Sequence, residues 1–473
     1  MDKYLLNIEN TGKSKYLQVY NHIKNMIQND MIKEGEKLPP IRNLSKKLGI
    51  NNTTVVKVYE LLEKEGYVYK IVGSGTFASR KKRLSISEKN ASNTIMFGSG
   101  NPSGDMFPVN EFKSAVNMAL EKEGSRIFEY DDGMGSINLR TKLLEYLEGL
   151  NIKTKVDNIQ IISGAQQGID IVCKGIINYS DVVFVEEPTY SGAIEVFKSR
   201  GARIIPIPML DDGIDIGILK LKLEKIRPKM IYVMPNFQNP TGISYTEYKK
   251  KKLIELSEEY DFYILEDDFI SDFSFNSQDN RTMRSYDESG RVIYIKSFSK
   301  IFMPGLRIGM IDIPSELMDR ILWAKYSTDI STPGLIQESL YYYMNNFKWD
   351  EHMKSMEHIY NEKYNTAMDS INEYFPGKIK VRKSSGGINF FCELPKGYSS
   401  KEFSRYLNNN GIQIIPGYNF FENIIDDRFF RINIAGESVD NIKKGIKLIA
   451  EYSDEFLRLK PNENIKESNK IFY

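Results

Sequence analysis

The chain has 473 residues, of which 41% are hydrophobic, so it is long enough to form at least two domains with packed cores. Its two cysteines, Cys173 and Cys392, exclude a disulfide framework, and their apolar neighbours predict two small buried side chains. The first residues lack an apolar run of signal-peptide length, and no stretch of the sequence approaches the ~18 apolar residues of a membrane span. We therefore expect a cytoplasmic protein without membrane contacts.

The formal net charge of +1 conceals an asymmetry between the two parts of the chain. Residues 1–83 carry 16 Lys and Arg against 8 Asp and Glu, whereas the remaining 390 residues carry 48 against 55. A small basic module joined to a larger acidic one is typical of a nucleic-acid-binding domain tied to a second function. A lysine-rich solvated surface would give the same charge, so charge alone leaves both interpretations open.

The pattern from residue 16 to residue 78 predicts a winged helix. Apolar residues recur at helical spacing, small residues close the helices, and Gly73-Ser74-Gly75 is a turn signal between two short apolar runs. The predicted elements are a helix over 16–27, a helix that ends at Gly49, a helix capped by Asn51 or Asn52 that ends at Gly66, and strands over 67–71 and 76–78. Three helices followed by a hairpin form this fold.

The pattern changes beyond a polar linker at residues 81–94, which separates a domain over 1–80 from one over 95–473. Apolar strands there alternate with amphipathic helices, as expected for an α/β domain with a mostly parallel, seven-stranded sheet covered on both faces. The strands are predicted at 159–163, 182–186, 203–207, 230–234, 262–266, 292–296 and 307–313. Shorter elements after about residue 375 predict a small C-terminal subdomain.

The N-terminal segment resembles the winged helix of GntR-type regulators. The resemblance rests on Leu38–Ser45, Gly49–Val55 and the wing Gly73–Phe77. Small polar groups at a helix N-terminus reach bases or phosphates, basic side chains neutralise phosphates, and glycines let a wing approach the DNA backbone. The candidate DNA-binding residues are Arg42, Asn52, Thr53, Thr54, Lys57, Gly73 and Gly75.

Two positions depart from the GntR pattern. The family usually has Ser where Pro40 stands and Arg where Asn52 stands, so the operator is expected to differ or the affinity to be lower. A winged helix that contacts protein instead of DNA is the alternative, and the basic excess favours DNA.

The motif Ser297-Phe298-Ser299-Lys300, followed by Pro304–Gly309, resembles the lysine motif of fold-type I aminotransferases, which use pyridoxal phosphate. Pyridoxal phosphate (PLP) chemistry needs one lysine amine to hold the cofactor aldehyde as a Schiff base, and Lys300 is the candidate. Several further motifs follow in the order found in fold-type I aminotransferases, and from about residue 95 to residue 452 the chain resembles that family.

The resemblance implies a role for each further motif residue. Asp267, more than Asp268, would pair with the pyridine nitrogen, and Arg431 would grip a substrate carboxylate. Tyr130 matches a tyrosine that reaches the phosphate of the other subunit, which implies a homodimer. The remaining contacts implied are Asn239 at the phenolic oxygen, Tyr190 stacked on the ring, and Ala165, Gln166, Ser297 and Arg307 at the phosphate. No metal site is predicted.

One departure bears on catalysis. The family commonly has a tyrosine two or three residues after the aspartate, where it donates to the phenolic oxygen. Phe269 and Ile270 stand at those positions, and neither has a hydroxyl group. Cofactor binding is expected to survive, whereas efficient transamination is less secure.

A GntR-type DNA-binding domain fused to an aminotransferase-like domain is the arrangement of the MocR family of regulators. The resemblance implies a head-to-tail homodimer that binds double-stranded DNA and senses either PLP itself or a small amino compound, through an aldimine at Lys300. The sequence does not choose between these effectors. The alternatives are an active aminotransferase that carries a DNA-binding domain, and a winged-helix protein whose second domain holds no cofactor.

Overall fold

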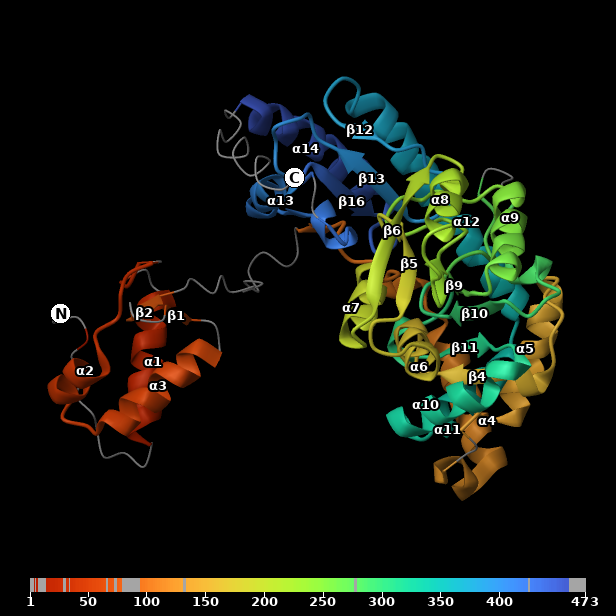
Figure 1. The fold of residues 1–473 in the computed structure, drawn as a ribbon, viewed down its shortest axis with the longest axis horizontal. Coiled ribbons are helices and arrows are strands. Elements are labelled where there is room, and N and C mark those ends of the chain that lie inside the picture. Colours follow the sequence, from red (N-terminus) through yellow and green to blue (C-terminus); the bar gives the residue numbers. More distant parts are fainter. Residues whose placement is uncertain are drawn as a thin grey trace. The chain divides into compact units, whose positions relative to one another are not determined.

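The computed structural model describes Tyr4, Leu6 and residues 14–28, 31–33, 35–64, 67–71, 75–78, 94–130, 133–275, 279–423 and 426–458. The chain forms two compact units, Met1–Ser92 and Asn93–Tyr473, each with its own core (Figure 1). Among the described residues, no helix is both long and apolar enough to cross a membrane.

The first unit is the predicted winged helix. Helices α1 (Lys15–Gln28), α2 (Ile41–Leu48) and α3 (Asn52–Lys64) precede the antiparallel hairpin of β1 (Val68–Ile71) and β2 (Gly75–Ala78). Helix α2 ends at Gly49, whose φ of 61° lies in the left-handed region of backbone conformation. Glycine adopts this conformation more readily than any other residue. The apolar faces of the three helices, including Val55 and Leu62, form one buried core.

The large sheet of the second unit contains the seven predicted strands and one more. Its order is β4-β11-β10-β9-β8-β5-β6-β7. The strands are β4 (Ile159–Ile162), β5 (Val182–Glu187), β6 (Arg203–Leu210), β7 (Gly213–Ile214), β8 (Met230–Val233), β9 (Tyr263–Asp268), β10 (Val292–Ser297) and β11 (Gly309–Asp312). The predicted number of seven strands was wrong, because the sheet has eight. The additional strand is β7, which has two residues and folds back antiparallel onto the end of β6.

Alternate residues of these strands belong to two different cores, as expected for a sheet buried on both faces. Phe184, Ile231 and Ile264 belong to one core, which also contains the inner residues of α8 (Ile216–Leu223) and α9 (Glu247–Glu259). Their neighbours in sequence face a larger core on the other side. The helices that contribute to that larger core include α4 (Val109–Glu123), α5 (Ile137–Gly149), α6 (Ala165–Ile176), α7 (Ser191–Ser199), α10 (Met318–Asp329) and α11 (Gly334–Asn346).

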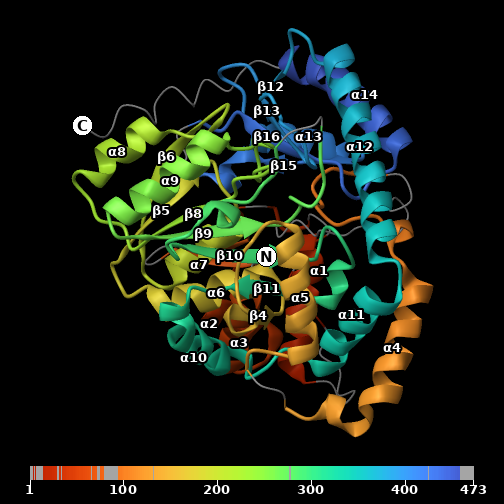
Figure 2. The same ribbon diagram turned by 90° about the vertical axis from the view of Figure 1, so that its right-hand side faces the viewer.

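The C-terminal subdomain is built on a four-stranded antiparallel sheet with the order β12-β13-β16-β15. The strands are β12 (Lys380–Val381), β13 (Asn389–Glu393), β15 (Ile415–Pro416) and β16 (Phe429–Asn433). Helix α13 (Ser400–Asn409) belongs to this part, and α14 (Val439–Arg458) packs against the long α12 (Trp349–Tyr374) (Figure 2). The segment β3 (Ile95–Met96) pairs with β14 (Ile412–Gln413), so the start of the unit joins this subdomain.

Candidate functional site

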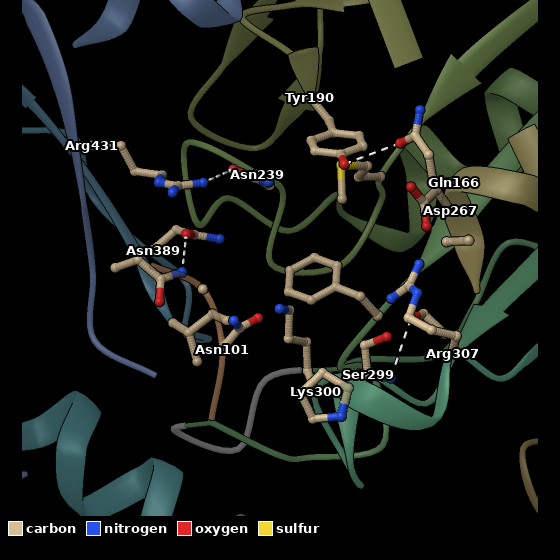
Figure 3. A pocket seen from close by; sticks show the side chains of 18 residues that line it. Asn101, Gln166, Tyr190, Asn239, Asp267, Ser299, Lys300, Arg307, Asn389 and Arg431 are labelled. Carbon is tan, nitrogen blue, oxygen red and sulfur yellow. Dashed lines mark hydrogen bonds between the residues drawn. The ribbon is translucent and has the colours of Figure 1, made fainter. Parts of the chain in front are cut away.

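A cavity of about 320 Å³ lies where the strands of the large sheet end and the C-terminal subdomain begins (Figure 3). The carboxyl ends of parallel strands meet at one sheet edge, which is where ligands bind in open α/β sheets. Nine of the predicted residues line this cavity together: Ala165, Gln166, Tyr190, Asn239, Asp267, Ser297, Lys300, Arg307 and Arg431. The lining contains three cationic side chains and one acidic one, so it favours an anionic ligand.

Lys300 follows β10, and its side chain ends inside the cavity (Figure 3). Its backbone carbonyl accepts a hydrogen bond from the Tyr360 hydroxyl at 2.9 Å, which fixes the segment after the strand. Burial lowers the pKa of the Lys300 amine to about 8, and the nearby Arg431 and Arg307 act in the same direction. A fraction of the amine is therefore unprotonated and nucleophilic near neutral pH.

Asp267 and Asp268 are consecutive residues at the end of β9, and only Asp267 lines the cavity. Its carboxylate accepts a hydrogen bond from the Tyr232 hydroxyl at 2.6 Å, and burial raises its pKa to about 6. Asp268 points elsewhere and forms an ion pair with the fully buried Lys296 at 3.1 Å. Asp267 thus presents an acid to the cavity, while Asp268 balances an internal charge.

One end of the cavity is suited to a phosphate group. Ala165 and Gln166 begin α6, and the first N–H groups of a helix have no acceptor within it. Arg307 lies against this helix start, since a Cβ atom on Gly164 would be 2.7 Å from the Arg307 guanidinium. Ser297, at the end of β10, adds a hydroxyl group to the same lining. Together these groups supply N–H donors, a helix dipole and a positive charge.

Tyr190 stands at the start of α7 and lines the cavity. Its hydroxyl donates to Oε1 of Gln166 at 3.1 Å, and the amide of Gln166 donates to the carbonyl of Gly192 at 2.9 Å. Burial raises the pKa of the Tyr190 hydroxyl. These bonds hold the ring in place, with its edge tied to the phosphate end.

Arg431 reaches the cavity from β16 of the C-terminal subdomain. Its guanidinium donates to Oδ1 of Asn239 and to the carbonyl of Gly98, each at 3.0 Å. It also stacks on the Phe420 ring at 5.2 Å, while its Nε is buried and makes no hydrogen bond within the described part of the chain. Burial lowers the pKa of Arg431 to about 10. A buried arginine with an unused donor is a suitable seat for a carboxylate.

Tyr130 does not reach this cavity. Its side chain is 84% exposed and lines a separate hollow with Glu129, Ser136 and Glu338. Sequence reasoning missed other lining residues, chiefly Gly100, Asn101, Asn389 and Asn433. The sequence contains an indication that Asn433 belongs to the site. It stands two residues after Arg431 on the same strand, so both side chains lie on the same face.

The predicted DNA contacts lie on α2, α3 and the wing. Arg42, Asn52, Thr53 and Lys57 are exposed, and Thr54 is half-buried. Asn52 accepts a hydrogen bond from Ser45, which ties α3 to α2, and the Lys57 ammonium lies 4.3 Å from the centre of the Tyr16 ring. Gly75 is exposed at the start of β2, whereas Gly73 lies outside the described residues.

Comparisons with known proteins match both units. Residues 92–449 match the family model of aminotransferase class I and II, and residues 15–78 match that of the bacterial regulatory proteins of the gntR family. The HTH-type transcriptional regulator YcxD of Bacillus subtilis is 28% identical over 93% of this chain and 99% of its own. Aromatic-amino-acid aminotransferase 1 of Thermococcus litoralis is 30% identical over 76% of this chain and 88% of its own. The crystal structure of Pyrococcus horikoshii kynurenine aminotransferase in complex with PMP matches with a TM-score of 0.74 and 30% identity, over 79% of this chain and 93% of that one.

Proposed function

Because the chain belongs to the class I and II aminotransferase family and carries a gntR-type module, the arrangement of MocR regulators, we propose that it is a PLP-dependent transcription regulator. In this function the N-terminal unit binds double-stranded DNA, and the second unit senses PLP or a small amino compound at Lys300. The observation that carries the proposal is the position of Lys300 between two arginines, Arg307 and Arg431, in one cavity. The relative YcxD, which spans both units, bears the description of a transcriptional regulator.

The cavity residues fit the cofactor. Arg307 and the N-terminus of α6 suit its phosphate, and the buried carboxylate of Asp267 suits its ring nitrogen. Lys300 makes no side-chain hydrogen bond within the described residues, so its amine is available for the aldehyde. When bound, PLP supplies an aldehyde that condenses with amines and a ring that withdraws electrons from the bonds next to the amine.

The chain's own residues would recognise an amino compound in two places. Arg431 offers its guanidinium to a carboxylate, with Asn239 beside it. Lys300, whose pKa is lowered to about 8, can supply the neutral amine that condensation with an aldehyde requires. Arg431 belongs to the C-terminal subdomain and Lys300 to the large one, so a ligand held by both would bridge the two subdomains.

Regulation further requires that the ligand favours one arrangement of the DNA-binding units over another. We propose a homodimer for this purpose. Support comes from Tyr130 and Phe128, two aromatic side chains that are 84% and 70% exposed beside the start of α5. Exposed aromatic side chains of this kind are enriched at interfaces, and the family resemblance gives Tyr130 a role in the partner's cavity.

The test combines absorbance with DNA binding. PLP added to the full chain should produce a visible absorbance band that is absent in Lys300→Ala, and the affinity for a fragment of the protein's own promoter should change with PLP or with an amino acid. A chain that stays colourless with excess PLP, or a promoter affinity that is the same under all conditions, would contradict the proposal.

An active aminotransferase with a DNA-binding module is the second candidate, and the Thermococcus relative favours it. Phe269 argues for the regulator, because it lines the cavity without offering a hydroxyl group. Turnover of an amino donor with a keto acid separates the two. Rapid repeated turnover supports the enzyme, whereas binding with turnover on the scale of hours supports the regulator.

A further inference from the structure

Four asparagines line the Lys300 cavity, and two of them form a buried pair: Asn389 on β13 and Asn433 on β16. The two residues are direct partners in the antiparallel register, and each is only 2% exposed. Nδ2 of Asn433 donates to Oδ1 of Asn389 at 2.7 Å (Figure 3). Of the other two, Asn239 accepts the hydrogen bond from Arg431, and Asn101 lies in the chain next to Gly100 and is exposed.

The hydrogen bonds fix which end of Asn389 faces the ligand space. Oδ1 of Asn433 accepts from the backbone N–H of Ala435 at 3.0 Å, so its Nδ2 must be the donor to Asn389. Oδ1 of Asn389 is thereby occupied. Its Nδ2 makes no hydrogen bond within the described residues, which leaves two N–H donors for a ligand.

These donors lie beside the two groups that would hold an amino acid. Asn433 shares its strand face with Arg431, the carboxylate seat. A Cβ atom on Gly100 would lie 3.5 Å from both the Lys300 ammonium nitrogen and Nδ2 of Asn433, so the glycine keeps the space between them open. An amino acid with its carboxylate on Arg431 and its amine near Lys300 therefore has its side chain within reach of the asparagines.

We propose that the effector is a short amino acid with an uncharged hydrogen-bond acceptor in its side chain, of the serine or asparagine type, read by Asn389. This inference rests on the proposed function. An aliphatic side chain would leave the Asn389 donors unpaired, which sites of this kind reject. A second carboxylate would have to be buried on neutral donors, since the described lining has no cation besides Lys300, Arg307 and Arg431.

The test is a titration of the PLP-loaded full chain, followed by its visible absorbance. L-Asparagine is compared with L-leucine, which has nearly the same shape, and with L-aspartate, which differs by its charge. Asparagine should half-saturate the change at a concentration about tenfold or more below that of either analogue. Equal half-saturation for asparagine and leucine, or tighter binding of aspartate, would overturn the inference.

Variants of Asn389 test whether its side chain causes the preference for asparagine over leucine. Asn389→Leu and Asn389→Ala both remove the donors without offering an acceptor in their place, so either should abolish the tenfold preference for asparagine over leucine. Asn409→Leu, at an exposed position on α13, is the matched control and should retain it. A preference that survives Asn389→Leu or Asn389→Ala in a folded, PLP-loaded protein contradicts the assignment.

The outcomes also separate this inference from the proposed function. A protein whose absorbance responds to all amino acids alike keeps its sensing function and loses the selectivity. A PLP-loaded protein that responds to no amino acid refutes both the inference and the sensing of amino compounds, while the sensing of PLP itself remains testable on DNA.

Discussion

The guanidinium of Arg431 donates a hydrogen bond to Oδ1 of Asn239 at 3.0 Å, across the boundary between the two subdomains. Arg431 belongs to β16, and Asn239 to the turn between β8 and α9. Since we propose that Asn239 binds the cofactor and Arg431 a carboxylate, this bond would join the two proposed binding sites. A ligand that engages both residues changes the contact that joins the subdomains.

Replacing Arg431 should separate effector binding from cofactor binding. Arg431→Gln keeps hydrogen-bonding capacity and removes the charge, so amino acids should half-saturate at concentrations about thirtyfold higher or more, equivalent to roughly 2 kcal/mol. PLP affinity should change less than about threefold, since the phosphate end is intact. Absorbance titrations with PLP and then with amino acids measure both. Normal amino-acid titration of the variant would mean that the carboxylate binds elsewhere.

Removing the Lys300 charge should stabilise the cofactor-free protein. The pKa of the amine is lowered to about 8 in the folded state, from an ordinary value of 10.5, so folding is opposed by the burial of this charge. Lys300→Met should raise the free energy of unfolding by about 1–3 kcal/mol at pH 7.

The pH dependence of this effect has a fixed sign. Well below pH 8 the amine is charged in both the folded and the unfolded state, and the destabilisation is complete. Between pH 8 and pH 10.5 the folded protein loses the proton first, so the unfolded state binds more protons and the wild type gains stability as the pH rises. The advantage of Lys300→Met should therefore shrink across this window. Denaturant unfolding at pH 7 and pH 10 measures it, and an advantage that grows with pH would be inconsistent with a buried lysine charge.

We expect Asp267 to contribute to cofactor affinity and Asp268 to the stability of the fold. Asp267→Asn removes the acid that faces the cavity, so PLP affinity should fall about tenfold or more with little change in thermal stability. Asp268→Asn takes one of two carboxylates from the fully buried Lys296, the other being Asp272. Its cost should approach the 3–5 kcal/mol, in order of magnitude, of a broken buried pair. Thermal unfolding and PLP titration of both variants check this, and the reverse pattern would exchange the two roles.

Adding the missing hydroxyl group should favour catalysis. Phe269 lines the cavity, and together with Ile270 it occupies the two positions at which the family resemblance implies a tyrosine. Phe269→Tyr supplies a donor there, and the rate of transamination should rise about tenfold or more, within the range expected for a positioned hydrogen bond. Single-turnover absorbance kinetics measure the rate, with Phe275→Tyr, at a buried position outside the lining, as the control. An unchanged rate would show that another group limits the reaction.

The first unit should bind DNA largely through its positive charge. Arg42→Ala should weaken binding and lower the slope of log affinity against log salt by about 0.9, the contribution of one phosphate contact. Lys220→Ala, an exposed lysine on α8 of the other unit, should leave the slope unchanged. Fluorescence anisotropy at several salt concentrations gives both slopes. Equal slopes for wild type and Arg42→Ala would remove Arg42 from the interface.

Local patterns in the sequence sufficed for most of the fold. All seven predicted strands are present, because apolar runs of four to eight residues dominate a sheet that is buried on both faces. Strand β7 could not be predicted, since two residues carry no periodicity, and its pairing depends on the turn after β6. The pairing of β3 with β14 joins residues over 300 positions apart and likewise leaves no local signal.

Residues of the site could be predicted from the sequence only where they belong to a recognisable motif. Strand alternation puts Asp267 and Asp268 on opposite faces, but which face holds the cavity depends on the packing of the whole sheet. Asn389 follows Ile388 and precedes Phe390 in an apolar run, so the sequence does not distinguish it from a core residue, and its place in the cavity lining depends on how β13 pairs with β16. The sequence indicates only that Tyr232 belongs to a buried strand. Its hydrogen bond to Asp267 could not be predicted, because it requires β8 and β9 to be neighbours in the sheet.

We propose that one amine, on Lys300, couples ligand binding to DNA binding. Its most direct test is the affinity of the full chain for its own promoter fragment, measured by anisotropy with and without saturating PLP, for the wild type and Lys300→Ala. We expect the affinity to change about fivefold or more for the wild type, in the range typical of allosteric coupling, and not at all for the variant. The same response to PLP in both proteins would contradict it.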